Sequence, residues 1–185
     1  MAPDWARAAS IKLAIFDVDG VLTDGRIVID DNGVESKFFN VRDGHGIKLL
    51  QRAGLTVGLL TGRQSEVVDR RAAELGIQLV YQGIKNKVEA YDIILRDLSL
   101  TDDQTAFAGD DLIDLPVMRR VGLALSPADA IDEVKSISHF VSRFPGGHGA
   151  VREMVEFILK AQGKWEEVTA RYFWAPRPIL IAGAH

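Results

Sequence analysis

The sequence contains no cysteine. Disulfide bridges, thiolate metal sites and cysteine nucleophiles are therefore excluded, and any metal ion must be held by oxygen or imidazole ligands. Long apolar runs are missing as well. The longest early run, residues 11–16, contains Lys12 and ends in Asp17, so it is neither a signal-peptide core nor a membrane span. We expect a cytoplasmic protein with no membrane partner.

The sequence also lacks an excess of positive charge, because 22 Lys and Arg residues are outnumbered by 26 Asp and Glu residues and the net charge is -4. This balance argues against nucleic-acid binding, which needs a basic surface. Hydrophobic residues make up 47% of the 185 residues, as in ordinary globular proteins. We therefore expect a single domain over residues 1–185 with one core.

Short apolar runs alternate along the chain with stretches of helical spacing. The runs are apolar throughout, which is typical of strands buried on both faces of a parallel sheet. They comprise residues 13–16, 57–60, 79–81, 106–108 and 122–125. Apolar residues recur at helical spacing within residues 47–53, 67–75 and 88–98. The pattern predicts an α/β fold, a doubly wound, mainly parallel sheet with helices on both faces.

Two segments depart from this alternation. Residues 26–30 and 34–39 are β-prone and flank an Asp-Asn-Gly turn signal, which predicts a β-hairpin over about residues 25–40 that projects after the first strand. Residues 149–160 predict a C-terminal helix, and Pro176 and Pro178 should keep the tail from Arg171 onward out of any long helix. We therefore expect the C-terminal helix and tail to occupy about residues 150–185.

Polar residues follow the predicted strands, and ligands of an open parallel sheet gather at the carboxyl ends of its strands. The candidate residues are Asp17, Asp19, Thr61, Arg63, Lys87, Asp110, Asp111 and Asp114. Carboxylates that meet at one edge repel unless a cation neutralises them, and oxygen ligands suit Mg²⁺. A phosphate there would meet Mg²⁺, the Lys87 ammonium and the Thr61 hydroxyl, with a carboxylate in line as nucleophile.

The order of these residues resembles the four motifs of haloacid dehalogenase superfamily phosphatases. Residues 17–24 (DVDGVLTD) match the first motif, Thr61 the second, Lys87 the third and residues 109–114 (GDDLID) the fourth. Taken singly, each residue has a structural alternative as a turn, a helix cap or a solvated side chain. A signalling receiver domain uses similar residues, but Thr61 precedes Lys87 here and the second acidic cluster follows both, which is the wrong order for a receiver.

The resemblance implies a role for each motif residue. Asp17 would be the nucleophile and a Mg²⁺ ligand, and Asp19 the general acid and base as well as a ligand through its backbone carbonyl. Asp110 would bind the metal directly and Asp114 through a coordinated water. Thr61 and Lys87 would bind the phosphoryl oxygens, while the role of Asp111 stays open.

The chain resembles the capless members of this superfamily, because only a hairpin follows the first motif and residues 61–87 leave room for one helix and one strand. A capless site is open to water, so we expect neighbouring subunits to shield it.

Further motifs resemble the family of 3-deoxy-D-manno-octulosonate 8-phosphate phosphatases. They are residues 39–47 (FNVRDGHGI), 82–87 (QGIKNK), 114–118 (DLPVM) and 146–153 (GGHGAVRE), and the likeness extends from about residue 11 to about residue 164. The resemblance implies a homotetramer that releases phosphate from an eight-carbon sugar acid in lipopolysaccharide biosynthesis. The alternatives are a phosphatase for a related nine-carbon sugar-acid phosphate and a non-catalytic assembly module of the same fold.

The implied substrate carries a carboxylate in addition to its phosphate, so its recognition needs further cations. The candidates by motif position are Arg42, His45 and Arg63. Each has a local structural alternative, in which Arg63 caps or pairs on its helix, His45 packs, and Arg42 holds the hairpin.

Overall fold

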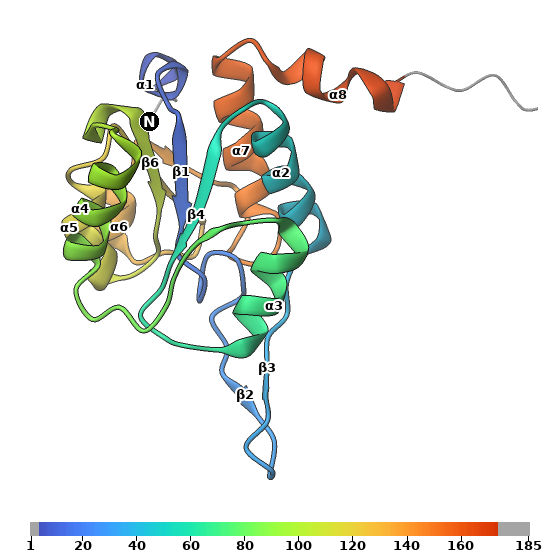
Figure 1. The fold of residues 1–185 in the computed structure, drawn as a ribbon, viewed down its shortest axis with the longest axis vertical. Coiled ribbons are helices and arrows are strands. Elements are labelled where there is room, and N and C mark those ends of the chain that lie inside the picture. The colour runs from blue at the N-terminus through green and yellow to red at the C-terminus, as the bar shows by residue number, and fades with distance from the viewer. Residues whose placement is uncertain (1–3, 174–185) are drawn as a thin grey trace, which may run out of the picture.

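The computed structural model describes residues 4–173, in which a six-stranded sheet lies between two layers of helices (Figure 1). The strand order is β5-β4-β1-β6-β7-β8, and every neighbouring pair is parallel. The strands are β1 Leu13–Phe16, β4 Thr56–Leu60, β5 Leu79–Tyr81, β6 Thr105–Ala108, β7 Leu123–Ser126 and β8 Phe140–Val141. The doubly wound α/β fold expected from the sequence is confirmed.

The helices cover both faces of the sheet. One layer contains α2 Val41–Arg52, α3 Glu66–Leu75 and α7 Ala150–Ala161, and the other contains α4 Lys87–Leu98, α5 Leu115–Met118 and α6 Asp132–Ile137 (Figure 1). The short helix α1 Trp5–Ala9 and the last helix α8 Trp165–Phe173 extend the first layer. Single 3-10 turns span Asp102–Gln104 and Leu112–Asp114.

Strand β1 lies at the centre of the sheet and contributes to both cores. Ala14 and Phe16 pack into the α2 and α7 layer, whereas Leu13 and Ile15 pack into the α4 and α5 layer. Successive side chains of a strand point to opposite faces, so both faces of β1 must be apolar. This explains why its sequence is an unbroken apolar run.

The β-hairpin projects from the body after β1 (Figure 1). Its paired strands, β2 Val28–Ile29 and β3 Glu35–Ser36, are shorter than the predicted runs 26–30 and 34–39. The Asp30 carboxylate accepts the backbone N–H groups of Asn32 and Val34 and so closes the turn. Soon after β3 the chain reaches the body of the domain, where Asn40 caps α2. The hairpin ladder therefore does not continue beyond β3.

The C-terminal part matches the predicted helix over residues 149–160, observed as α7, and adds α8 after a short turn. Pro176, Pro178 and the rest of the tail lie outside the described residues. Strand β8 was not predicted, because two residues carry no readable periodicity. Within residues 4–173 none of the helices combines the length and apolar character that crossing a membrane requires.

Candidate active site

Three candidate side chains are carried to one edge of the sheet by parallel strands. Asp17 follows β1 directly, Thr61 follows β4, and Asp110 comes two residues after β6. The backbone ladder continues into these positions, since the Asp17 N–H donates to the Ala108 carbonyl and the Thr61 N–H to the Tyr81 carbonyl, each at 2.9 Å. The sheet therefore fixes the backbone of this edge up to the candidate residues themselves.

Lys87 lies between two buried carboxylates. Its Nζ is 3.0 Å from Asp17 Oδ2 and 2.6 Å from Asp114 Oδ1, and all three side chains are almost completely buried. Burial by itself would lower the pKa of the Lys87 ammonium, but the two carboxylates outweigh this effect and raise it. Lys87 therefore carries a positive charge at the floor of the site.

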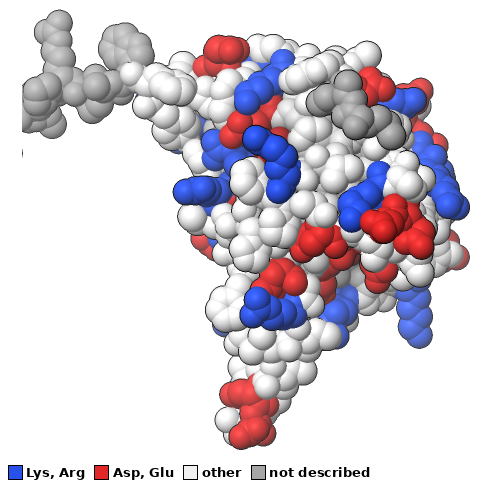
Figure 2. Space-filling model, turned by 180° about the vertical axis from the view of Figure 1, so that it is seen from behind, with Lys and Arg blue, Asp and Glu red and all other residues white. Residues whose placement is uncertain are grey.

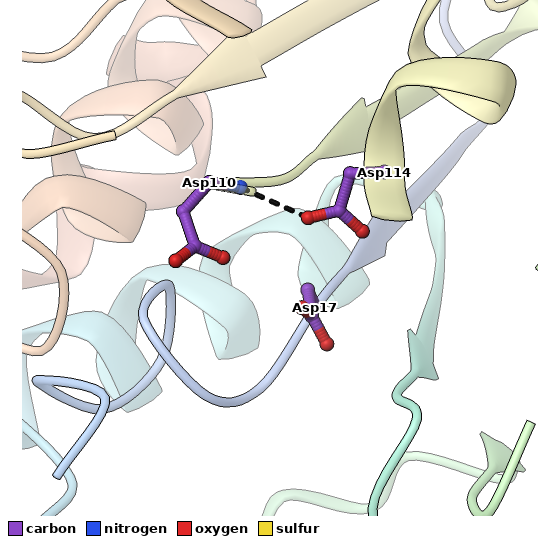
Figure 3. Close-up of side chains that lie close together, drawn as sticks. All are labelled: Asp17, Asp110 and Asp114. Carbon is purple, nitrogen blue, oxygen red and sulfur yellow. Dashed lines mark hydrogen bonds between the residues drawn. The ribbon is translucent and has the colours of Figure 1, made fainter. Parts of the chain in front are cut away.

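Asp110 faces the same cluster from the neighbouring strand (Figure 3). Asp114 Oδ2 accepts the backbone N–H groups of Asp110 and Asp111 at 3.0 and 3.3 Å, which fixes the turn between them. The Asp110 side chain, in contrast, has a buried oxygen, Oδ1, without a hydrogen-bond partner among the described residues. Asp111 caps the Leu112–Asp114 turn by accepting the Leu112 N–H at 2.7 Å, and it also lines the pocket above the cluster.

Two carboxyl groups of this cluster, those of Asp17 and Asp110, resist ionisation. Burial raises the pKa of Asp17 to about 6, with Lys87 opposing and Asp114 adding to the shift. Burial also raises the pKa of Asp110 to about 8, and the negative charges of Asp17 and Asp114 add to that effect. Each carboxyl group is therefore held in a place where its ionised form needs a further positive charge.

The arrangement fits a divalent cation. One oxygen each from Asp17, Asp110 and Asp114 lies within 4.8 Å of the others. Three carboxylates and the single Lys87 ammonium sum to a formal charge of -2. The donors are all carboxylate oxygens, which suit a hard ion such as Mg²⁺, and the unpartnered Asp110 oxygen offers a ready ligand.

Gly20 lets the loop after Asp17 pass over Asp110. Its φ is +88°, and a Cβ there would lie 2.0 Å from Asp110 Oδ2. Any larger residue would push the Asp110 carboxylate out of the cluster. The requirement for glycine in the DVDG stretch is therefore steric as well as conformational.

The loop before α7 supports the Asp17–Gly20 segment from outside. The Gly147 N–H donates to the Val21 carbonyl at 3.0 Å. At Gly146 the two backbones are so close that a Cβ would lie 1.8 Å from the Gly20 carbonyl oxygen. The backbone of the GGHG stretch thus packs closely against the loop that follows Asp17 and supports it.

Asp43 holds the start of α7 in place. Its carboxylate accepts the backbone N–H groups of Gly149 at 3.1 Å and Arg152 at 2.7 Å. Burial raises the pKa of this carboxyl group even though these donors act against the rise. The sequence analysis selected Arg42 and His45 as candidates but missed Asp43. The hydrogen-bond partners of Asp43 are more than 100 residues away in the sequence.

A pocket of about 240 Å³ opens above the cluster. Its lining includes Asp17, Asp19, Thr61, Arg63, Asp110 and Ile113. Asp19 lies at its side, where its carboxylate pairs with Lys37 of the hairpin and lies 3.7 Å from Arg63 Nε. The pocket thus brings Asp17, Asp19, Thr61, Arg63 and Asp110 to one opening, with Lys87 and Asp114 buried beneath it.

Arg42 and His45 are not brought into this pocket within one chain. Arg42 lines a separate pocket of about 460 Å³ together with Arg143, His148 and Arg152. His45 packs on α8, where its Nε2 lies 2.8 Å from the Tyr172 hydroxyl. Burial and the nearby arginines lower the pKa of His45.

The parallel sheet, the buried acidic cluster and its lysine define a haloacid dehalogenase-like hydrolase, and the family model of that description matches residues 77–154. No cap domain is found among the described residues.

Similarity to characterised relatives extends over most of the chain. The 3-deoxy-D-manno-octulosonate 8-phosphate phosphatase KdsC of Escherichia coli is 46% identical over 162 residues, which are 88% of this chain and 86% of the relative. The chain therefore belongs to the 3-deoxy-D-manno-octulosonate 8-phosphate phosphatase family.

Two solved structures resemble the fold closely. A probable YrbI family phosphatase from Pseudomonas syringae superposes with a TM-score of 0.91 at 46% identity, covering 93% of this chain and 98% of that one. The 3-deoxy-D-manno-octulosonate 8-phosphate phosphatase of Moraxella catarrhalis, in complex with a magnesium ion, a phosphate ion and a KDO molecule, superposes with a TM-score of 0.89 at 39% identity. It covers 91% of this chain and 97% of that one.

Proposed function

We propose that this chain is a Mg²⁺-dependent phosphatase that hydrolyses 3-deoxy-D-manno-octulosonate 8-phosphate to the free sugar acid and phosphate. The observation that carries the proposal is the buried cluster of Asp17, Asp110 and Asp114, which retains a formal charge of -2 after pairing with Lys87. Membership of the family and the magnesium, phosphate and KDO complex of the relative from Moraxella catarrhalis support the same assignment.

Asp17 and Asp110 would hold the metal ion through their carboxylates, Asp19 through its backbone carbonyl and Asp114 through a coordinated water. When bound, Mg²⁺ neutralises the acidic cluster and the charge on the transferring phosphoryl group. Thr61 and Lys87 bind the phosphoryl oxygens and hold them in line with Asp17.

Asp17 acts as the nucleophile. Its carboxylate oxygen attacks phosphorus, the bond from phosphorus to the sugar oxygen breaks, and Asp17 carries the phosphoryl group as an acyl phosphate. Asp19 donates a proton to the departing sugar alkoxide. It then takes a proton from the water that attacks phosphorus, which releases inorganic phosphate and restores both carboxyl groups. The position of Asp19 at the side of the pocket supports this division of roles.

The substrate carboxylate needs a cation outside the phosphate site. Arg63 lines the pocket and is the candidate within the same chain. Arg42 and His45 remain candidates only through a neighbouring subunit, because neither lines the pocket of its own chain. We further propose that the chain is a single domain over residues 1–185 and that it works as a homotetramer in the cytoplasm.

Release of inorganic phosphate from a panel of sugar-acid phosphates, with and without Mg²⁺, tests this function. We expect the eight-carbon acid phosphate to give the highest kcat/KM, and activity to require the metal. Higher kcat/KM for a nine-carbon sugar-acid phosphate would assign the chain to that related reaction. Absence of phosphate release from every ester in the panel would leave a non-catalytic assembly role as the better description.

A further inference from the structure

Four charged side chains form a closed ring beside the pocket. The Lys37 ammonium pairs with Asp19 Oδ1 and lies 3.5 Å from Glu35 Oε1. Arg63 Nη2 lies 2.9 Å from the same Glu35 oxygen, and Arg63 Nε lies 3.7 Å from Asp19 Oδ2. The ring alternates in sign and links three segments that are distant in sequence: the loop after β1, the hairpin strand β3 and the loop after β4.

The side chain of Lys37 is almost completely buried although its residue belongs to a projecting hairpin. Its side chain is 1% exposed, whereas those of Asp19 and Glu35 are 20% and 19% exposed. An ammonium group removed from water is costly unless it is paired. The contacts with Asp19 and Glu35 compensate for this cost, so the position of Lys37 is tied to that of Asp19.

Asp19 has few other restraints. The Asp17 carboxylate is held by the Val18 N–H at 2.7 Å and by Lys87. Among residues 4–173, the Asp19 carboxylate pairs with Lys37 and lies near the more distant Arg63, and no backbone N–H donates to it. The placement of the Asp19 carboxyl group therefore depends on the hairpin.

We propose that Lys37 is a positioning residue that holds the Asp19 carboxyl group beside the pocket, with Glu35 fixing Lys37 in turn. The proposal rests on the proposed function, in which Asp19 transfers the proton to the leaving group. Proton transfer needs a donor within hydrogen-bond reach of the leaving oxygen, and displacement by about 1 Å can cost about 100-fold in rate. Strand β3 is then a working part of the active site as well as a surface element.

The first experiment compares Lys37→Met with the matched control Arg26→Met. Arg26 is also a hairpin cation, but it is largely exposed and pairs with Asp24 outside the ring. We expect Lys37→Met to lower kcat for an alkyl phosphate by about 10- to 100-fold with little change in KM, and Arg26→Met to leave both unchanged. The loss should be smaller for an aryl phosphate, whose leaving group needs less protonation.

A double-mutant cycle separates positioning from a general structural role. If Lys37 acts through Asp19, Lys37→Met should cause no further loss in an Asp19→Asn background. Lys37→Arg should recover part of the lost activity, because it retains a cation at this place. Glu35→Gln should give a weaker loss with the same dependence on the leaving group. Circular dichroism and thermal unfolding confirm that each variant is folded.

Two results would overturn the positioning role. One is an equal loss on alkyl and aryl phosphates in folded Lys37 and Glu35 variants, and the other is a full additional loss in the Asp19→Asn background. The test does not depend on the sugar acid, because simple alkyl and aryl phosphates serve as probes. If the wild-type protein hydrolyses these probes but not 3-deoxy-D-manno-octulosonate 8-phosphate, the proposed substrate is refuted. The double-mutant cycle of Lys37 and Asp19 would still test the positioning role.

Discussion

The α-carbon of Gly20 lies against the Asp110 carboxylate so closely that a Cβ at Gly20 would be 2.0 Å from Asp110 Oδ2. The backbone of the first motif at Gly20 thus packs directly against the Asp110 side chain of the fourth motif. The space that Gly20 leaves open therefore decides where the Asp110 carboxylate, a proposed metal ligand, can lie.

Gly20→Ala should therefore lower kcat at saturating Mg²⁺ by about 100-fold or more, because the added methyl group displaces Asp110. Gly54→Ala is the matched control. Gly54 has a similar φ of +83° but no atom within 4 Å of the added Cβ. It should lose about 1 kcal/mol of stability, or about 2 to 4 °C in Tm, and keep full activity. Equal activities of the two variants would contradict the steric argument.

Asp17→Asn should abolish turnover while the protein stays folded, because an amide is a poor nucleophile and a weaker Mg²⁺ ligand. We expect a loss of at least about 1000-fold in kcat, measured by phosphate release. Thermal unfolding without metal is the control, since removing one charge from the acidic cluster should leave Tm unchanged or higher. Activity near that of the wild type would show that Asp17 is not the nucleophile.

The pKa of Asp110, raised to about 8 by burial and neighbouring negative charge, makes the metal-free protein sensitive to pH. The folded state keeps the proton up to about pH 8, whereas the unfolded state releases it near 3.8, the ordinary pKa of an aspartate side chain. Stability contributed by this proton is therefore complete at low pH and is lost as pH rises through about 8. Tm without metal should therefore fall as pH rises from 3.8 to about 8. The protons of Asp17 and Asp110 both contribute to this fall up to about pH 6, where Asp17 ionises, and the Asp110 proton alone contributes from there to about pH 8.

Mg²⁺ should reverse this trend, because it binds the ionised carboxylates and stabilises the folded state. The rise in Tm on adding Mg²⁺ should be larger at pH 8 than at pH 6, and EDTA should remove both the rise and the activity. Asp110→Asn should flatten the pH dependence of the metal-free protein and abolish the response to Mg²⁺. A Tm that is constant or increasing from pH 6 to 8 without metal would contradict the assignment.

The sequence predicted the fold and the meeting of Asp17, Thr61 and Asp110, because each follows an apolar run and parallel strands bring their carboxyl ends to one edge. Their catalytic roles remain predictions. Lys37 was missed, since a lysine in a short hairpin gives no sign of burial before the chain is folded. Asp43 was missed because its partners on α7 become neighbours only through tertiary packing. The periodicity of apolar residues in the sequence indicates which face of a helix or strand is buried. It does not indicate which distant segment forms a hydrogen bond with a given side chain.

The hairpin carries apolar side chains that the body of one chain does not cover. Ile27, Ile29, Val34 and Phe38 are between 57% and 68% exposed. The space-filling view shows a largely uncharged projection with acidic side chains at its tip (Figure 2). Two paired residues per strand are too few for a stable isolated hairpin, so we expect neighbouring subunits to cover it.

Ile29→Lys combined with Val34→Lys should therefore reduce the proposed homotetramer to smaller species, because two charges would be buried at each contact. Asp31→Lys, at the turn itself, controls for added charge and should leave the assembly intact. Multi-angle light scattering gives the mass of each species, and phosphate release gives its activity. The double variant should also lose activity on the sugar-acid phosphate, since a capless site depends on its neighbours for shielding. A wild-type protein that is a fully active monomer at assay concentration would show that the hairpin serves only its own chain, through Lys37 and Glu35.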